Sequence, residues 1–230
     1  MLDWSKISTV LLDMDGTILD LHFDNHFWLE HLPKRYAQIA NISQEQAKEK
    51  LVNHYQRVEG TISWYCLDYW AEQTQLPITE LKREVQHLIK LRDDAHHFLV
   101  ALKETGREII LVTNAHPESL SLKIERTQLD QYFDQLYSTH EFGVTKESQL
   151  LWQRLQEKQG FDSARTLFVD DSIVILDSAK KFGIKHLLAV ANPDSKQATK
   201  IISNYPSISD FNSLLADIKQ YPIEKAPLKS

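Results

Sequence analysis

The segment at residues 13–17, with the letters DMDGT, contains the residue types that most directly suggest chemistry. It follows a short apolar stretch that is typical of a buried strand. Asp13 and Asp15 would repel each other there, and burying them unpaired would cost free energy that a divalent cation removes. Gly16 allows a sharp turn, and Thr17 offers a hydroxyl and an N–H group to an anion. We therefore expect a Mg²⁺ site with a nucleophilic carboxylate.

The two acids suggest different roles in phosphoryl transfer. Asp13 could attack phosphorus to give an aspartyl-phosphate, which divides a difficult reaction into two easier steps. Asp15 could protonate the leaving oxygen and later accept a proton from the attacking water.

Three further segments carry residues of matching chemistry. The hydroxyl of Thr113 and the amide that follows it, at Asn114, could bind phosphoryl oxygens. The ammonium of Lys146 would neutralise charge on the nucleophile and on the transferring group. Asp170 and Asp171 would complete an oxygen-rich site suited to Mg²⁺. Each segment alone also has an ordinary interpretation, as a helix cap or as a solvated lysine.

Strand-like apolar runs place these polar residues at strand ends. The runs are residues 9–12, 108–112, 135–138, 165–169 and 185–190. Helical patterns lie between the later runs, at residues 118–128, 147–159 and 173–182. This alternation predicts an α/β fold with an open, mostly parallel sheet covered on both faces. Ligands bind beyond the carboxyl ends of the strands in such sheets, which is where the candidate residues lie.

The interval at residues 20–92 differs, because it contains no convincing strand. Ser43 begins a capping-box pattern that apolar residues follow at helical spacing. An aromatic-rich helical stretch covers residues 61–71, and a third helical pattern begins at Thr79. We predict an all-helical cap that excludes water during the reaction. The predicted division is a core at residues 1–19 and 93–221, a cap at 20–92 and a frayed tail at 222–230.

Composition narrows the class of protein. The chain has 230 residues, of which 42% are hydrophobic and 25% charged, which suffices for a full core. Its formal net charge is -6 and no basic run appears, so a nucleic-acid partner is not expected. Cys66 is the single cysteine, which excludes an internal disulfide framework. Neither a signal-peptide pattern nor a membrane-spanning stretch is present, so we expect a cytoplasmic protein with no membrane partner.

In order along the chain, residues 13–17, Thr113, Lys146 and the pair 170–171 resemble the four signatures of the haloacid dehalogenase superfamily. The helical insertion also lies where that superfamily places a helical cap. The resemblance covers the whole catalytic core and implies a Rossmann-like sheet, Mg²⁺ dependence and an aspartate nucleophile.

The resemblance also implies roles for single residues. Asp15 would be the acid/base, with its carbonyl bound to the metal, and Asp171 a direct metal ligand beside Asp13. An acid at position 15 further implies a phosphatase, since dehalogenases of the superfamily lack it. Many members carry another acid where this chain has Ile175, so the outer metal ligands depart from the family pattern.

A closer resemblance extends over nearly the full length. The similar segments are residues 19–28, 64–70, 113–117, 168–172 and 192–195, and they are similar to the bacterial GMP/IMP nucleotidase branch. The implied activity is hydrolysis of purine 5′-nucleotides to nucleoside and phosphate. Another small phosphate ester, such as phosphoglycolate or a sugar phosphate, is the alternative substrate. A non-catalytic phosphate-binding module is the alternative of another class, although no essential residue is missing.

The same residue types also allow other interpretations. An EF-hand fails on spacing, because the glycine of residues 13–17 is fourth rather than sixth in the loop. Zinc at the histidine pairs 22/26 or 96/97 lacks a third ligand nearby. The cap aromatics could stack on a purine base or form the core of the cap. Asp24 and Asn25 could contact substrate, with helix capping as the alternative.

Overall fold

The computed structural model describes residues 2–223 and contains one six-stranded, fully parallel sheet. The strand order is β3-β2-β1-β4-β5-β6. The strands are β1 (Thr9–Leu12), β2 (Glu108–Thr113), β3 (Gln135–Ser138), β4 (Thr166–Asp170), β5 (His186–Val190) and β6 (Ser207–Ile208). All four residues of β1 are buried between two neighbouring strands and two layers of helices, which explains the unbroken apolar run.

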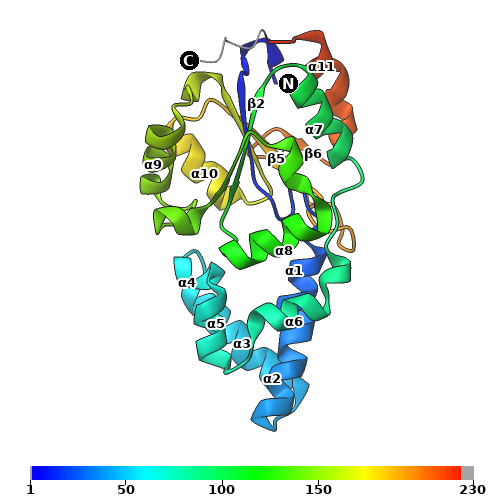
Figure 1. Cartoon of the computed structure of the whole chain (residues 1–230), viewed down its shortest axis with the longest axis vertical. Helices are drawn as coiled ribbons and strands as arrows, with labels where there is room; N and C mark the ends of the chain where they lie inside the picture. The colour runs from blue at the N-terminus through cyan, green and yellow to red at the C-terminus, as the bar shows by residue number, and fades with distance from the viewer. Residues whose placement is uncertain (1, 224–230) are drawn as a thin grey trace.

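Helices cover both faces of the sheet, as expected for a parallel α/β fold (Figure 1). They are α7 (Ala95–Glu104), α8 (Pro117–Thr127), α9 (Gln149–Gln159), α10 (Ile173–Phe182) and α11 (Leu215–Gln220). Val10 and Leu12 pack on the face covered by α7 and α11. Leu11, which points the other way, packs with residues of α9 and α10. The period-2 alternation of β1 therefore divides the core into two layers.

Short 3₁₀ turns complete the sheet-containing part. They are η1 (Trp4–Lys6), η4 (Leu129–Tyr132), η5 (Thr139–Phe142), η6 (Ser163–Arg165) and η7 (Phe211–Leu214).

A separate group of helices lies beyond the carboxyl ends of the strands, next to α8 (Figure 1). Its elements are α1 (His22–His26), the π-helical turn η2 (Phe27–His31), α2 (Leu32–Ala40), α3 (Gln44–Val58), α4 (Ile62–Tyr65), α5 (Leu67–Thr74), α6 (Ile78–Glu84) and the 3₁₀ turn η3 (Gln86–Leu88). We call this group the cap. The predicted parallel-sheet core with an inserted all-helical cap is confirmed, whereas the residue limits of the domains stay a prediction.

Local sequence signals account for much of the cap. The Ser43 hydroxyl accepts from the N–H of Gln46, and the Gln46 side chain accepts from the N–H of Ser43, so α3 begins with the predicted capping box. The single helix predicted over residues 61–71 is wrong. The chain is extended at Cys66, with φ −85° and ψ 116°, and divides the stretch into α4 and α5. The indole N–H of Trp70 donates to the Trp64 carbonyl across this break, a tertiary contact that periodicity does not reveal.

Two predictions concern the C-terminal tail and membrane-spanning helices. The frayed tail was predicted from residue 222; the N–H of Ile223 donates to the Thr105 carbonyl, and residues 224–230 lie outside the described residues. Within residues 2–223, no helix combines the length and the apolar character needed to cross a bilayer.

Candidate active site

The candidate residues converge because three neighbouring parallel strands end at the same edge of the sheet. Leu12 at the end of β1 lies opposite Leu111 of β2 and Val169 of β4. Asp13 therefore follows β1 beside the ends of β2 and β4, and its N–H donates to the Val169 carbonyl at 3.0 Å. Thr113 and Asp170 are the last residues of those two strands.

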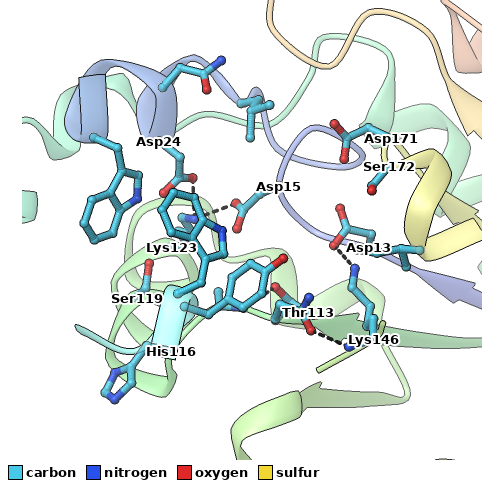
Figure 2. Close-up of a pocket in the computed structure, with 18 of the residues that line it drawn as sticks. Asp13, Asp15, Asp24, Thr113, His116, Ser119, Lys123, Lys146, Asp171 and Ser172 are labelled. Atoms are coloured by element: carbon cyan, nitrogen blue, oxygen red, sulfur yellow. Dashed lines mark hydrogen bonds and ion pairs between the residues drawn. The ribbon is translucent and has the colours of Figure 1, made fainter. Parts of the chain in front are cut away.

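A buried lysine joins two of these strand ends (Figure 2). The ammonium of Lys146 donates to Asp13 Oδ1 and, at 2.7 Å, to Asp170 Oδ2. Burial opposes the charge of Lys146, but the two carboxylates raise its pKa above the ordinary value. Lys146 is therefore a fixed cation directly beside the candidate nucleophile.

The acids around Asp13 suit a divalent cation. Oxygens of Asp13, Asp170 and Asp171 lie within 4.8 Å of one another. Asp13 Oδ2 is buried and has no hydrogen-bond partner within residues 2–223. Two ammonium groups face the three carboxylates, because Lys146 contacts Asp13 and Asp170 and the exposed Lys200 lies 4.0 Å from Asp171. Burial raises the pKa values of Asp13 and Asp170 to about 6 and that of Asp171 to about 7. These residues fit Mg²⁺, a hard cation that prefers carboxylate oxygens and water.

The side chain of Asp15 belongs to a different group of charges. Its Oδ1 accepts from the ammonium of Lys123 at 2.6 Å. Lys123 also donates to Asp24 Oδ2 at 2.7 Å, and Lys82 donates to Asp24 Oδ1 at 2.9 Å. Burial raises the pKa of Asp15 to about 7, which favours a protonated acid near neutral pH. Burial alone would raise the pKa of Asp24, but the two lysines hold it well below its ordinary range.

Asp24 and Asn25 line the cavity, yet both side chains already have protein partners. Each oxygen of Asp24 accepts from a lysine, and Asn25 Nδ2 donates to Asp194 Oδ2 at 2.7 Å. Neither side chain acts as a cap of α1, because no cap hydrogen bond is present there. Contact of these two residues with substrate stays a prediction.

Lys82 and Lys123 are site residues that the sequence did not single out. A signal was nevertheless present for Lys82, which lies four residues after Ile78 and three before Val85, both of them buried. This spacing places Lys82 on the buried face of its helix, where a lysine requires a partner.

The loop at residues 13–17 depends on Gly16. Its φ is +85°, and a Cβ atom there would lie 2.9 Å from both Asp171 Cγ and Pro193 Cβ. The N–H groups of Gly16 and Thr17 donate within the loop, to the carbonyls of Leu19 and Met14. Neither residue lines the cavity, and the buried hydroxyl of Thr17 has no partner within residues 2–223. Phosphate binding by Gly16 and Thr17 stays a prediction.

Thr113 and Asn114 line the cavity and also organise its loops. The Thr113 hydroxyl accepts from the N–H of Ala115 at 3.0 Å. Asn114 Oδ1 accepts from the N–H of Lys146 at 2.9 Å, and its Nδ2 donates to Glu147 at 3.1 Å. Asn114 therefore fixes the segment that carries Lys146.

These residues surround a cavity of about 430 Å³ between the core and the cap, a volume typical of small-ligand sites (Figure 2). The core contributes Asp13, Asp15, Lys146 and Asp171, among others. Besides Asp24, Asn25 and Lys82, the cap contributes an aromatic wall and one glutamate. These residues are Trp28, Tyr55, Glu59, Trp64 and Tyr65.

The cap aromatics divide between the two roles that were considered. Trp70 is fully buried and contacts Trp28, Tyr55 and Trp64 edge-on, so it belongs to the core of the cap. Trp28 and Trp64 are half-buried, stack with planes 29° apart, and line the cavity. These two rings are available to an aromatic ligand.

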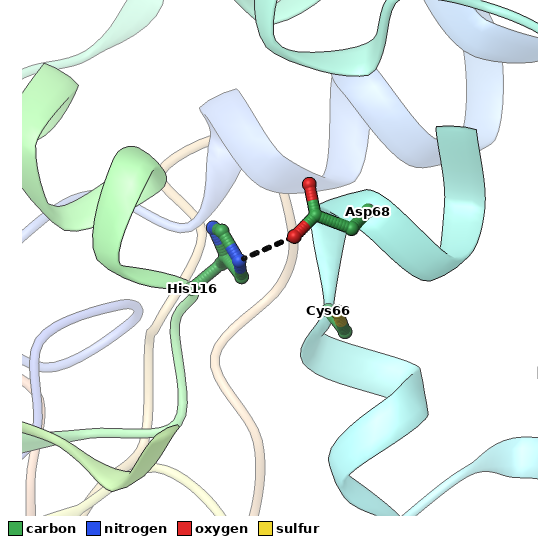
Figure 3. A group of neighbouring side chains, drawn as sticks. All are labelled: Cys66, Asp68 and His116. Carbon is green, nitrogen blue, oxygen red and sulfur yellow. Dashed lines mark ion pairs between the residues drawn. The ribbon is translucent and has the colours of Figure 1, made fainter. Parts of the chain in front are cut away.

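A second group of possible metal ligands is better explained as a contact between cap and core (Figure 3). It consists of Cys66, Asp68 and His116. His116 Nδ1 accepts from the N–H of Glu118 at 3.3 Å, so the neutral ring carries its proton on Nε2, 3.6 Å from Asp68 Oδ2. A metal-binding histidine normally donates from its second nitrogen, which is the opposite polarity. Within residues 2–223, the histidine pairs 22/26 and 96/97 belong to no three-ligand group.

Comparison with known proteins gives a consistent picture. Residues 7–183 match the model of the haloacid dehalogenase-like hydrolases. The chain is 46% identical over 215 residues to the GMP/IMP nucleotidase YrfG of Escherichia coli (strain K12), covering 94% of this chain and 97% of that protein. It is 23% identical over 190 residues to an (S)-2-haloacid dehalogenase of Pseudomonas sp. (strain YL), covering 77% and 80%. The crystal structure of a HAD phosphatase from Thermococcus onnurineus shares the fold, with a TM-score of 0.78, 20% identity, and coverage of 94% and 100%.

Proposed function

This chain belongs to the haloacid dehalogenase-like hydrolases, and on that premise we propose that it is a Mg²⁺-dependent phosphatase of purine 5′-nucleotides, with GMP and IMP as substrates. The observation that carries the proposal is that Asp13, Asp15 and Lys146 line one cavity whose opposite wall is aromatic. A nucleophile, an acid and a fixed cation thus face a space with room for a base. The similarity to YrfG supports the choice of nucleotide.

In the first half-reaction, a carboxylate oxygen of Asp13 forms a bond to phosphorus while the bond from phosphorus to O5′ breaks. Protonated Asp15 gives its proton to O5′, so the nucleoside leaves as an alcohol. The ammonium of Lys146, which already contacts Asp13, compensates charge on the nucleophile and the phosphoryl group.

In the second half-reaction, water attacks the phosphorus of the aspartyl-phosphate and the bond to the Asp13 oxygen breaks. Asp15, now a carboxylate, takes the proton of that water. Inorganic phosphate leaves, and both aspartates return to their starting states.

Mg²⁺ would be held by the carboxylates of Asp13 and Asp171, with Asp170 and the Asp15 carbonyl completing the protein ligands. When bound, the cation stabilises negative charge on the phosphoryl oxygens. Asp13 Oδ2 is buried without a partner within residues 2–223, and carboxylates outnumber ammonium groups beside it; both observations support this assignment.

Features of the cap support a 6-oxopurine base. Trp28 and Trp64 line the cavity and stack on each other, so they form an aromatic part of its wall. Glu59 lines the same cavity, and its carboxylate has no ion pair or hydrogen bond within the described part of the chain. Guanine and hypoxanthine share an N1–H donor that such a carboxylate accepts, whereas N1 of adenine is an acceptor. Such a hydrogen bond favours guanine and hypoxanthine over adenine, which lacks the donor.

A substrate panel tests the proposal. We expect kcat/KM for GMP and IMP to exceed that for AMP, phosphoglycolate and sugar phosphates, and all turnover to stop in EDTA. A clear preference for a non-nucleotide would overturn the substrate assignment. If clean protein showed no metal-dependent turnover of any ester, a non-catalytic phosphate-binding module would replace the enzyme.

A further inference from the structure

Two buried lysines and two partly buried aspartates form a continuous chain of charges across the boundary between core and cap. Figure 2 shows the part of it from Asp15 through Lys123 to Asp24. In order, they are Asp15, Lys123, Asp24 and Lys82. Asp15 and Lys123 belong to the core, on the loop after β1 and on α8. Asp24 and Lys82 belong to the cap, on α1 and α6. We call this group the charge chain; its two carboxylates and two ammonium groups balance.

Burial makes the charge chain unlike the ion pairs on the surface. Lys123 is 1% exposed and Lys82 is 2% exposed. Removing such charges from water costs several kcal/mol per ion, so a buried pair is weak support for stability and is better explained by a need for defined geometry. All four residues line the cavity, and the charge chain ends at Asp15, the proposed acid/base.

We propose that Lys123 is a positioning residue for Asp15, and that the cap residues Asp24 and Lys82 hold Lys123 in register. The proposal rests on the proposed function, because it assigns Asp15 the task of protonating the leaving oxygen. Lys123 binds one oxygen of Asp15, Oδ1. This contact restricts rotation of the carboxyl group and leaves Oδ2 as the oxygen that exchanges a proton with the leaving oxygen.

The same contact serves the chemical step. As the bond from phosphorus to oxygen breaks, the Asp15 proton moves to the leaving oxygen and Asp15 becomes an anion. The ammonium of Lys123 already lies 2.6 Å away and stabilises that anion without rearrangement. Since Lys123 is also bound to Asp24 of the cap, the acid is aligned when the cap is seated on the core.

The dependence on the leaving group tests this role. An alkyl ester such as GMP needs a proton on its leaving oxygen, whereas p-nitrophenolate leaves without one. We expect Lys123→Met to lower kcat/KM for GMP about 10²-fold and that for p-nitrophenyl phosphate no more than about threefold. We compare kcat/KM because this ratio depends only on the steps up to departure of the leaving group. The later hydrolysis of the aspartyl-phosphate therefore does not affect the comparison. Lys123→Arg should recover part of the loss on GMP.

Controls separate positioning from folding. Lys123→Met leaves the two carboxylates of Asp15 and Asp24 with one ammonium group, that of Lys82. The second variant is therefore Asp24→Asn/Lys123→Met, in which one carboxylate and one ammonium group remain. It should show the same selective loss on GMP with a wild-type-like melting temperature. Lys158→Met, on the exposed face of α9, is the matched control and should change neither substrate. An equal loss on both esters, or no loss on either, would overturn the proposal.

Crystal structures supply a readout that does not depend on turnover. Wild type and Asp24→Asn/Lys123→Met should differ in the side-chain conformation of Asp15. An unchanged Asp15 would contradict the positioning role even if the natural substrate were not a nucleotide. Wild-type activity on GMP judges the proposed function separately.

Discussion

At the scale of single residues, Asp13 and Asp15 are two positions apart but face different partners. Asp13 contacts Lys146 and retains one buried oxygen that has no partner within residues 2–223. Asp15 contacts Lys123 and lies outside the group of three acids. In the proposed mechanism, environment and not residue type therefore separates the nucleophile from the proton carrier.

Asp13→Asn should remove turnover while the protein stays folded. An amide cannot form the aspartyl-phosphate, so we expect kcat on GMP to fall by on the order of 10⁴-fold or more. The side chain keeps its size, so circular dichroism and the melting temperature should change little. Substantial remaining activity would mean that another group attacks phosphorus.

Gly16→Ala should destabilise the protein more than a matched glycine substitution. The new Cβ would lie 2.9 Å from atoms of Asp171 and Pro193, in addition to the strain of a positive φ. Gly143→Ala is the control, because φ is +66° there and no heavy atom lies within 4 Å of the added Cβ. We expect losses of about 1–2 kcal/mol for Gly143→Ala and about 3 kcal/mol or more for Gly16→Ala, by urea denaturation. If both variants lost the same stability, the structure around residue 16 would have adjusted to remove the contact of the new Cβ with Asp171 and Pro193.

At the scale of elements, the strands that carry the site could be predicted, because a strand buried on both faces leaves an unbroken apolar run. β1 and β3 have the predicted limits, β2 and β5 differ by one residue at one end, and β4 is shifted by one residue at both ends. β6, with two residues, is too short to produce a pattern and was missed. Polar residues at the strand ends likewise gave the candidate site in the core.

Site residues on helices could not be predicted in the same way. Lys82, Lys123 and Glu59 come from α6, α8 and the end of α3, and tertiary packing decides which of their faces meets the cavity. A lysine or glutamate on a helix is usually solvated, so residue type alone carries little information. The structure shows in addition that both lysines, Lys82 and Lys123, are buried against carboxylates.

Glu59→Gln tests the part of the cap proposed to select the base. Glu59 follows α3, and the next residue, Gly60, accepts from the Thr145 hydroxyl at 3.1 Å, which fixes this end of the cap beside Lys146. We expect kcat/KM for GMP to fall about 10- to 100-fold and the preference over AMP to shrink, because the charged acceptor is lost. p-Nitrophenyl phosphate should be unaffected. Glu49→Gln, exposed on the same helix and outside the cavity, is the control.

The junction between core and cap predicts a pH dependence of stability. Asp20 Oδ1 accepts from the N–H groups of His22 and Ser195, each at 3.0 Å, and Lys90 lies 3.4 Å from Oδ2. Burial opposes ionisation of Asp20, but the hydrogen bonds from Ser195 and His22 outweigh it and lower its pKa. A lowered folded-state pKa stabilises the protein above the unfolded-state pKa of about 3.9, and this stability is lost as the pH falls through the folded-state value.

Asp20→Asn should therefore be less stable than wild type at pH 7 by about 1 kcal/mol, and the difference should shrink below about pH 4. Urea denaturation at several pH values measures it. A difference that stays constant down to pH 3 would mean that ionised Asp20 does not stabilise the junction.

At the scale of the whole molecule, the cap lies beyond one end of the sheet (Figure 1), and residues of both parts line the candidate site. Side-chain contacts hold the two parts together at more than one place. Tyr65 donates to Glu147 at 2.9 Å beside Lys146, while Asp24 binds Lys123 beside Asp15. The nucleophile and the acid are thus each next to a contact between the two parts. This arrangement links closure over a ligand to completion of the site.

The excess negative charge of the site gives the last prediction. Asp13, Asp170 and Asp171 outnumber the ammonium groups of Lys146 and Lys200 beside them, in a chain whose net charge is already -6. A bound cation should therefore stabilise the fold as well as permit turnover. We expect EDTA to abolish activity, Mg²⁺ to restore it, and Mg²⁺ at about 100 times its Kd to add about 2.7 kcal/mol of stability. Asp171→Asn should lose most of this Mg²⁺-dependent shift, whereas Asp130→Asn, exposed and remote from the cavity, should keep it. If Mg²⁺ stabilised both variants equally, the cation would bind elsewhere. Stabilisation by a bound ion depends on the residues that hold it, so loss of a ligand must reduce the stabilisation.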